Sequence, residues 1–220
     1  MTAKDLISYG IVSLIPNNTF EEALKLMDEY KVEHLPVIDG CDFLGIITEA
    51  EIFSNKDLSS IIGSQILPSS NQYIYENQHF YDILVIASNG NLTLIPVLDI
   101  NNHYLGVITL RDLIKKYSEI SSIKNQGGII ILEMNINDYS LVEIAGIIET
   151  NGAKILNMYV SPHIDSTKME ISLKINRVDV APILQTFERY NYNVLASFGE
   201  SEINDNIKER YESLMNYLNI

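Results

Sequence analysis

Residues 94–97 read Leu-Ile-Pro-Val, and residues 106–112 read Gly-Val-Ile-Thr-Leu-Arg-Asp. Residues 94–97 lie in an apolar run over residues 92–98. A second apolar run, over residues 104–108, leads into the stretch that ends at Asp112. Polar residues 99–102 separate the two runs. Two short apolar runs joined by a polar turn predict a β-hairpin.

The hairpin is followed by a corner that can bind a small molecule. Thr109 stands just before a helical pattern over residues 110–117, where a hydroxyl can cap free backbone N–H groups. Asp112 lies one helical turn further on, so we expect it on the same side as Thr109. A hydroxyl, a carboxylate and free amides at one corner can hold a sugar hydroxyl pair and a phosphate.

An earlier part of the chain repeats this pattern. Residues 34–37 read His-Leu-Pro-Val, and residues 45–51 read Gly-Ile-Ile-Thr-Glu-Ala-Glu. The two prolines stand 60 positions apart and the two glycines 61 apart. Two apolar pairs in the preceding helical patterns keep the spacing of 60: Phe20 with Phe80, and Leu24 with Leu84. A repeat in which several independent positions match predicts two copies of one structural unit.

On these residues the chain resembles the tandem CBS (cystathionine-β-synthase) domain family over about residues 1–118. Residues 106–112 match the family's pattern of Gly, two apolar residues, Thr, any two residues and Asp. The resemblance implies an α+β fold in which CBS domains at residues 1–60 and 61–120 form a pseudo-two-fold pair. It also implies that the Thr and the Asp contact the phosphate and ribose of an adenosine ligand.

The resemblance therefore predicts a nucleotide site in the second repeat, with Thr109 and Asp112 at its centre. Arg111 is expected at the phosphate, since the basic residues between 61 and 118 all follow Thr109. The other two, Lys115 and Lys116, can equally serve the helix C-terminal dipole. The adenine pocket is expected between two walls: Asn71, Gln72 and Tyr73 on one side, and Leu92, Thr93, Leu94, Ile95 and Pro96 on the other. Half-buried packing is the alternative role for Tyr73.

A weaker second site is expected in the first repeat at Thr48, Glu51 and His34. Glu51 stands where the family pattern has Asp, and its extra methylene moves the carboxylate outward by about one bond length. We therefore expect this site to be weaker or empty. His34 precedes a strand where the family often places a residue near phosphates, but a surface histidine is the favoured interpretation.

Residues 127–199 follow a pattern of predicted strands and helices that differs from that of the two repeats. The sequence pattern predicts six elements in this segment. They are a strand at 129–136, a helix at 140–150, strands at 154–161 and 168–175, a helix at 178–190 and a strand at 193–198. This order predicts a ferredoxin-like βαββαβ arrangement. The segment resembles the ACT domain, which often pairs through sheet edges and often binds amino acids.

The expected ligand loop of that family departs from its pattern here. Asp138 is followed by Tyr139 and Ser140 where the family has Pro-Gly, which removes the close backbone approach that glycine permits. A dimerisation or scaffold role is therefore favoured. Residues 200–220 carry apolar residues at helical spacing and predict an amphipathic C-terminal helix. The domain order is similar to that of the acetoin-utilisation AcuB family, an association that fold order alone supports.

Composition narrows the classes of partner. The formal net charge of −14 argues against nucleic acid and anionic membrane. The sequence has no apolar run of bilayer length and no signal-peptide core, and its single cysteine excludes an internal disulfide, so we expect a cytoplasmic protein.

Three functions are compatible with the sequence. The favoured one is a non-catalytic regulatory protein that senses an adenosine nucleotide such as AMP, ADP or ATP, needs no other cofactor, and forms a homodimer that acts on an unidentified protein. The alternative is a structural adaptor with degenerate ligand sites. An enzyme is the third, disfavoured because the four histidines show no metal-ligand spacing and no phosphate loop or nucleophile elbow appears.

Overall fold

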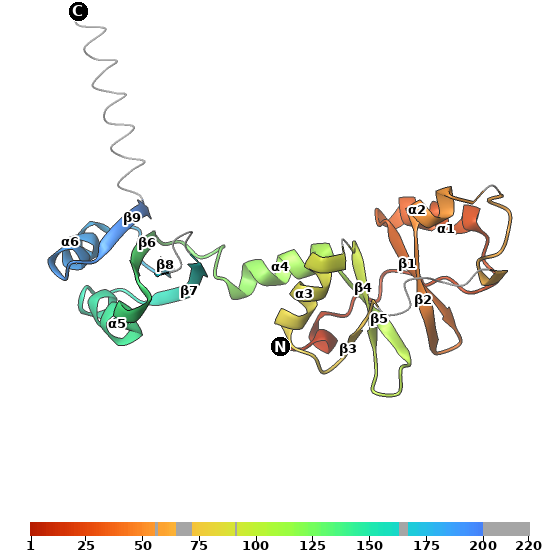
Figure 1. Ribbon diagram of the computed structural model, residues 1–220, viewed down its shortest axis with the longest axis horizontal. Helices are drawn as coiled ribbons and strands as arrows, with labels where there is room; N and C mark the ends of the chain where they lie inside the picture. Colours follow the sequence, from red (N-terminus) through yellow and green to blue (C-terminus); the bar gives the residue numbers. More distant parts are fainter. Residues whose placement is uncertain (56, 65–71, 91, 163–166, 200–220) are drawn as a thin grey trace, which may run out of the picture. The chain divides into compact units, whose positions relative to one another are not determined.

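The computed structural model describes residues 1–55, 57–64, 72–90, 92–162 and 167–199. The described residues form two compact units, the first over residues 1–116 and the second from residue 117 on (Figure 1). No helix within the described ranges is long and apolar enough to cross a bilayer.

The first unit contains two copies of a helix, a β-hairpin and a second helix. The first copy comprises α1 (Phe20–Tyr30), β1 (His34–Asp39), β2 (Asp42–Thr48) and α2 (Glu49–Phe53). The second comprises β3 (Ile74–Tyr75), α3 (Phe80–Gly90), β4 (Leu94–Leu98), β5 (Tyr104–Thr109) and α4 (Leu110–Ile120). Two short 3-10 helices, η1 (Ala3–Leu6) and η2 (Ile62–Ser64), precede the copies. The predicted duplication is thus present as structure.

Local sequence explains where these elements begin. Thr19 caps α1 by accepting a hydrogen bond from the backbone N–H of Glu22, whose carboxylate in turn accepts from the N–H of Thr19. This capping box satisfies two of the donors that a helix start leaves free. The five residues of β4 are all buried, as expected for a short, continuously apolar strand.

The two repeats exchange their first segments. Ala3 and Leu6 are buried in the core of the second repeat together with Phe80 and Ile83. The backbone N–H of Ser8 donates to the carbonyl of Val107 in β5, at 2.7 Å. Conversely, Ile62 belongs to the core of the first repeat, and its N–H donates to the carbonyl of Asn18, at 2.9 Å.

The start of the chain therefore completes the second repeat, and the segment between the repeats completes the first. The two cores are also joined at the hairpins, because Leu94 and Val107 of the second repeat pack in the core of the first. Each repeat therefore takes part of its core from outside its own stretch of sequence.

The second unit is a four-stranded antiparallel sheet with two helices. Its elements are β6 (Ile129–Asn135), η3 (Ile136–Asp138), α5 (Leu141–Thr150), β7 (Ile155–Pro162), β8 (Lys168–Ile175), α6 (Ala181–Arg189) and β9 (Asn193–Phe198). The strand order is β7-β8-β6-β9, and every neighbouring pair is antiparallel. This is the predicted ferredoxin-like arrangement.

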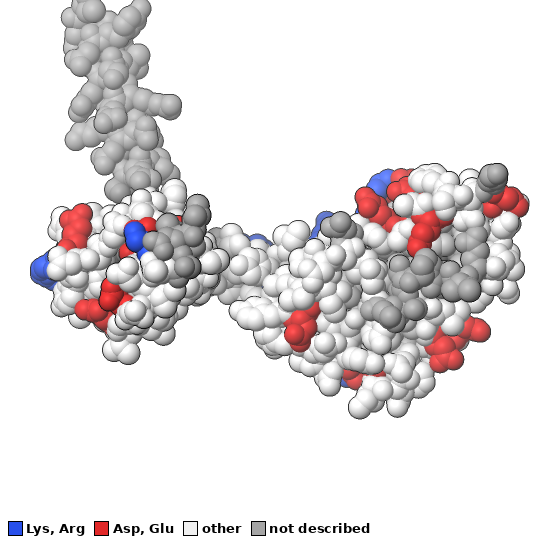
Figure 2. Space-filling model, in the orientation of Figure 1, with Lys and Arg blue, Asp and Glu red and all other residues white. Residues whose placement is uncertain are grey.

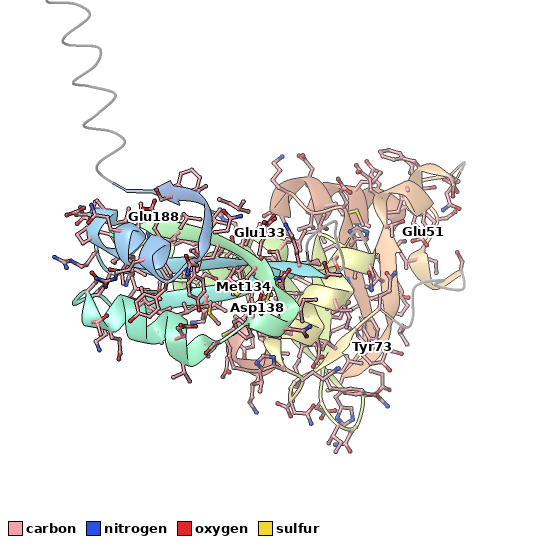
Figure 3. The ribbon with its side chains drawn as sticks, turned by 60° about the vertical axis from the view of Figure 1, so that its left-hand side comes forward. Glu51, Tyr73, Glu133, Met134, Asp138 and Glu188 are labelled. Atoms are coloured by element: carbon pink, nitrogen blue, oxygen red, sulfur yellow. The ribbon has the colours of Figure 1, made fainter. Side chains whose placement is uncertain are left out.

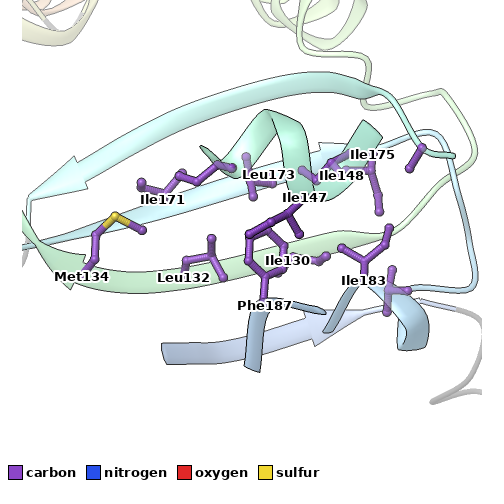
Figure 4. Packing of buried hydrophobic residues seen from close by; sticks show 13 residues of the cluster. Ile130, Leu132, Met134, Ile147, Ile148, Ile171, Leu173, Ile175, Ile183 and Phe187 are labelled. Atoms are coloured by element: carbon purple, nitrogen blue, oxygen red, sulfur yellow. The ribbon is translucent and has the colours of Figure 1, made fainter. Parts of the chain in front are cut away.

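The core of the second unit lies between the sheet and its helices. Alternate residues of β6 and β8, among them Leu132 and Leu173, point toward Ile148 of α5 and Phe187 of α6 (Figure 4). This alternation is the pattern expected of a sheet that is covered on one face. The helix expected over residues 178–190 begins at Ala181 instead, next to Pro182, whose fixed φ favours the first turn of a helix. The amphipathic helix expected over residues 200–220 lies outside the described residues.

Candidate functional site

The corner between β5 and α4 positions Thr109 and Asp112 as expected. The hydroxyl of Thr109 accepts a hydrogen bond from the backbone N–H of Asp112, at 3.0 Å, and so caps α4. The same hydroxyl donates to Oδ2 of Asp112, at 2.7 Å. The Asp112 carboxylate is therefore held in place beside the helix N-terminus before any ligand arrives.

A cavity of about 970 Å³ opens at this corner. Its lining comes from four segments of the first unit: Ser8, Gly10 and Ile11; Glu29 to Val32; Thr93; and Thr109 to Asp112 with Lys115. The volume lies within the range of small-molecule sites, which is roughly 300–1,000 Å³. Three predicted site residues, Thr109, Arg111 and Asp112, thus share one cavity.

The cavity gathers positive charge in an acidic protein. Lys31, Arg111 and Lys115 line it together with the carboxylates of Glu29 and Asp112. On the face drawn in Figure 2, acidic side chains are prominent and basic ones sparse, in keeping with the net charge of −14. Because α4 also directs its positive dipole end here, the cavity favours an anionic group.

Of the strand residues predicted to line the adenine pocket, Thr93 lines this cavity and its neighbours in β4 do not. Leu94, Ile95 and Pro96 are buried within β4 as core residues and do not line the cavity. Tyr73 packs edge-on against Phe43, with ring centroids 5.9 Å apart, and lies well away from Glu51 at the start of α2 (Figure 3).

Gln72 lies beside Gly90 at the end of α3. Neither Gln72 nor Tyr73 lines the cavity, and Asn71 lies outside the described residues. Ser8, Gly10 and Ile11 line the cavity, because the start of the chain pairs with β5 through Ser8 and Val107. The exchange of first segments between the repeats is therefore the physical reason that the start of the chain lines this cavity.

The corresponding corner of the first repeat has a different hydrogen-bond pattern. The Thr48 hydroxyl accepts from the N–H of Glu51, at 3.1 Å, and the Thr48 N–H donates to Oε2 of Glu51, at 2.8 Å. The longer Glu51 side chain thus folds back to close a capping box, whereas Asp112 bonds the threonine hydroxyl. By the offset of 60, the segment matching residues 8–11 is 68–71, which lies outside the described residues.

His34 is buried, so the expectation of a surface histidine was wrong. Its exposed fraction is 7%. Nδ1 lies 2.9 Å from Oγ1 of Thr93 and accepts a hydrogen bond from the Thr93 N–H at 3.3 Å. The Thr93 hydroxyl also accepts from the N–H of Glu33, at 3.0 Å. Burial lowers the pKa of His34 below its ordinary value of 6.5, against the opposite effect of the Glu33 and Glu51 charges.

Thr93 therefore links the cavity that it lines to the first repeat. Sequence reasoning placed Thr93 in the adenine wall, and it lines the cavity. It identified neither Lys31 nor residues 8–11 as part of the site. All of them reach the cavity through contacts between distant parts of the chain.

The ACT-like unit has a polar cavity of about 390 Å³ near the expected ligand loop, where Glu133, Met134 and Asp138 lie (Figure 3). Its polar side chains pair with one another. Glu133 accepts from Lys168, and Asp138 accepts from Asn135. The Tyr192 hydroxyl donates to Glu143 at 2.8 Å, and burial together with this carboxylate raises the pKa of Tyr192.

The loop itself is used to start α5. The Ser140 hydroxyl accepts from the N–H of Glu143, at 3.3 Å, and caps the helix. Tyr139 packs against the core of this unit. Across the described ranges, no group of three His, Cys, Asp or Glu side chains is arranged to hold a metal ion.

The fold and the repeated corner define a duplicated α+β module joined to a ferredoxin-like domain. A family model described as the CBS domain matches residues 3–56 and 64–119. The chain belongs to the CBS domain family and carries the domain twice.

Relatives and solved structures support the fold. The chain is 22% identical over 148 residues to an inosine-5'-monophosphate dehydrogenase of Methanocaldococcus jannaschii, which covers 67% of this chain and 30% of that protein. It is 23% identical over 121 residues to the CBS domain-containing protein YhcV of Bacillus subtilis, over 51% of this chain and 82% of that protein. The chain thus spans less than a third of the dehydrogenase.

A crystal structure of a CBS domain pair/ACT domain protein from Thermotoga maritima has a TM-score of 0.50 and 19% identity, and covers 54% of this chain and 98% of that chain. This likeness concerns the fold alone. The similarity to the acetoin-utilisation family rests on domain order and stays a prediction.

Proposed function

We propose that this chain is a non-catalytic regulatory protein that binds an adenosine nucleotide in the cavity beside Thr109 and Asp112. The observation that carries the proposal is the Thr109–Asp112 hydrogen bond at the N-terminus of α4, in a cavity large enough for a nucleotide. Membership of the CBS family supports it, since these two residues complete the family's ligand pattern.

Each group has a distinct task in this proposal. The Asp112 carboxylate accepts hydrogen bonds from the ribose hydroxyl pair, and Thr109 holds that carboxylate in position. Arg111 and the N-terminus of α4 bind phosphate, because a guanidinium and free backbone amides both favour an anion. The adenine lies against residues 8–11 instead of the strand residues first assigned to it.

We further propose that the first repeat binds more weakly through Thr48 and Glu51, because Glu51 already closes a capping box. His34 contributes through its contact with Thr93 rather than by touching ligand. The ACT-like unit serves dimerisation or signal output to a protein target. As expected from composition, we place the protein in the cytoplasm, without nucleic-acid or membrane partners.

The test is a thermal-shift measurement with AMP, ADP and ATP on the wild type and on Asp112→Asn, which keeps the size of the side chain and removes its charge. At about 100 times the dissociation constant, a ligand of the folded state stabilises it by roughly 2.7 kcal/mol. We expect a clear shift in the wild type and its loss in the variant. Glu51→Gln is the matched control and should keep the shift.

A structural adaptor is the second candidate function. Two observations favour it: Glu51 is engaged in the first corner, and Ser140 caps α5 where the ACT family places its ligand loop. The absence of any shift with the three nucleotides in the wild type would support the adaptor and contradict the sensor.

A further inference from the structure

Lys31 reaches the nucleotide cavity from the opposite repeat. It is the residue after α1, and its backbone is left-handed, with φ of 56° and ψ of 48°. Its N–H donates to the carbonyl of Met27, and so does the N–H of Val32, at 3.0 Å. These bonds fix the end of α1 and hold Lys31 in the lining of the cavity, on a segment separate from α4.

The remaining cations of the cavity lie on α4. Arg111 and Lys115 are four residues apart, so they project from one side of the helix. Together with the helix N-terminus, Arg111 suffices for one phosphate group. A third cation, on a segment separate from α4, can contact an anionic part of the ligand that extends beyond the first phosphate.

Lys31 is available for such a contact. Its ammonium group lies 2.7 Å from Oδ1 of Asp28, but the two side chains are 77% and 83% exposed. An ion pair this exposed contributes little and is easily exchanged for another anion. The volume of about 970 Å³ is at the upper end of the range for small-molecule sites, which leaves room for a longer phosphate chain.

We propose that the site selects nucleotides with two or more phosphates, and that Lys31 is the residue that distinguishes them from a monophosphate. This inference rests on the proposed function and names the ligand class more narrowly. The nucleoside and the first phosphate are bound by residues of the second repeat and by the start of the chain. The terminal phosphates are bound by Lys31 of the first repeat.

Isothermal titration calorimetry with AMP, ADP and ATP, at fixed ionic strength and without divalent cations, tests the proposal. The wild type should bind ADP and ATP more tightly than AMP. Lys31→Asn removes the charge while keeping a residue type that tolerates the left-handed backbone. We expect it to weaken ADP and ATP binding by about three- to tenfold and to leave AMP binding unchanged. Lys31→Arg should restore ATP binding.

Lys25→Asn is the matched control. Lys25 is exposed on the same helix, outside the cavity lining, and its loss changes the net charge equally. It should leave all three affinities unchanged. Equal affinity of the wild type for AMP and ATP, or an equal loss of both in Lys31→Asn, would overturn the role of Lys31 while leaving the nucleotide site intact. Failure of every nucleotide to bind would overturn the proposed function itself.

Discussion

His34 illustrates how one side chain can join two halves of a protein. Its Nδ1 accepts from the backbone of Thr93 and meets the Thr93 hydroxyl, so the neutral ring is the form that fits. Protonation of Nδ1 would convert this acceptor into a donor that faces another donor. We therefore expect the contact between the repeats to be sensitive to pH.

We expect the protein to lose stability as the pH falls below about 6.5. The pKa of His34 in the folded state is lowered from 6.5, so the unfolded chain takes up the proton first. The contribution of the neutral ring is complete above 6.5 and is lost as the pH falls toward the folded-state pKa. Melting temperatures between pH 7.5 and 5.5 should show this fall in the wild type and a flatter profile in His34→Gln.

His79→Gln controls for the loss of a histidine as such. His79 is exposed, and its ring accepts from the N–H of Tyr81, close by in the chain. Its pH profile should follow that of the wild type. Identical profiles for all three proteins would show that His34 does not link the contact between the repeats to pH.

At the scale of elements, Gly106 explains why β5 can receive the start of the chain. Its φ is +150°, and an added Cβ would lie 2.5 Å from Cγ2 of Ile7. The glycine of the family pattern thus permits close packing of the first segment against the strand that leads to Thr109.

Gly106→Ala should therefore destabilise the first unit by roughly 1–3 kcal/mol, because Ile7 must move and the backbone is strained. Denaturant unfolding followed by circular dichroism measures the change. Gly146→Ala is the contrasting variant, since Gly146 lies within α5 with open space around it. It should stabilise the second unit by about 0.5–1 kcal/mol. Equal stability of Gly106→Ala and the wild type would contradict the close packing.

The elements of the ACT-like unit were largely predictable. β8 and β9 have the predicted bounds, because alternating apolar residues determine both strands. The grouping of Thr109, Arg111 and Asp112 was also predictable, because these residues lie within four consecutive positions at one corner. Lys31 and residues 8–11 were not, because their places depend on contacts between segments far apart in the sequence.

The correction for His34 has the same origin. Nothing in the residues around position 34 indicates burial of a polar ring, since its partner, Thr93, lies 59 positions away. A repeat in a sequence shows that two units are alike. It does not show which segments each unit takes from the other.

At the scale of the whole molecule, the exchanged segments predict that the second repeat does not fold alone. A fragment of residues 61–120 lacks Ala3 and Leu6, whose exposed fractions are 0% and 8% in the full chain. Loss of such buried side chains leaves cavities that cost about 2–5 kcal/mol each for a large residue. Thermal melts should show no cooperative transition for this fragment and a cooperative one for residues 1–120. A sharp transition in the short fragment would contradict the exchange.

The exchange of first segments also bears on how such a gene can change. A recombination event that copies or deletes one repeat along its sequence boundary separates each core from the piece that completes it. The product would contain a repeat without the segment that completes its core, whereas an event that moves both repeats together keeps every contact. The unit that can be inherited, duplicated or grafted onto another protein is therefore the pair.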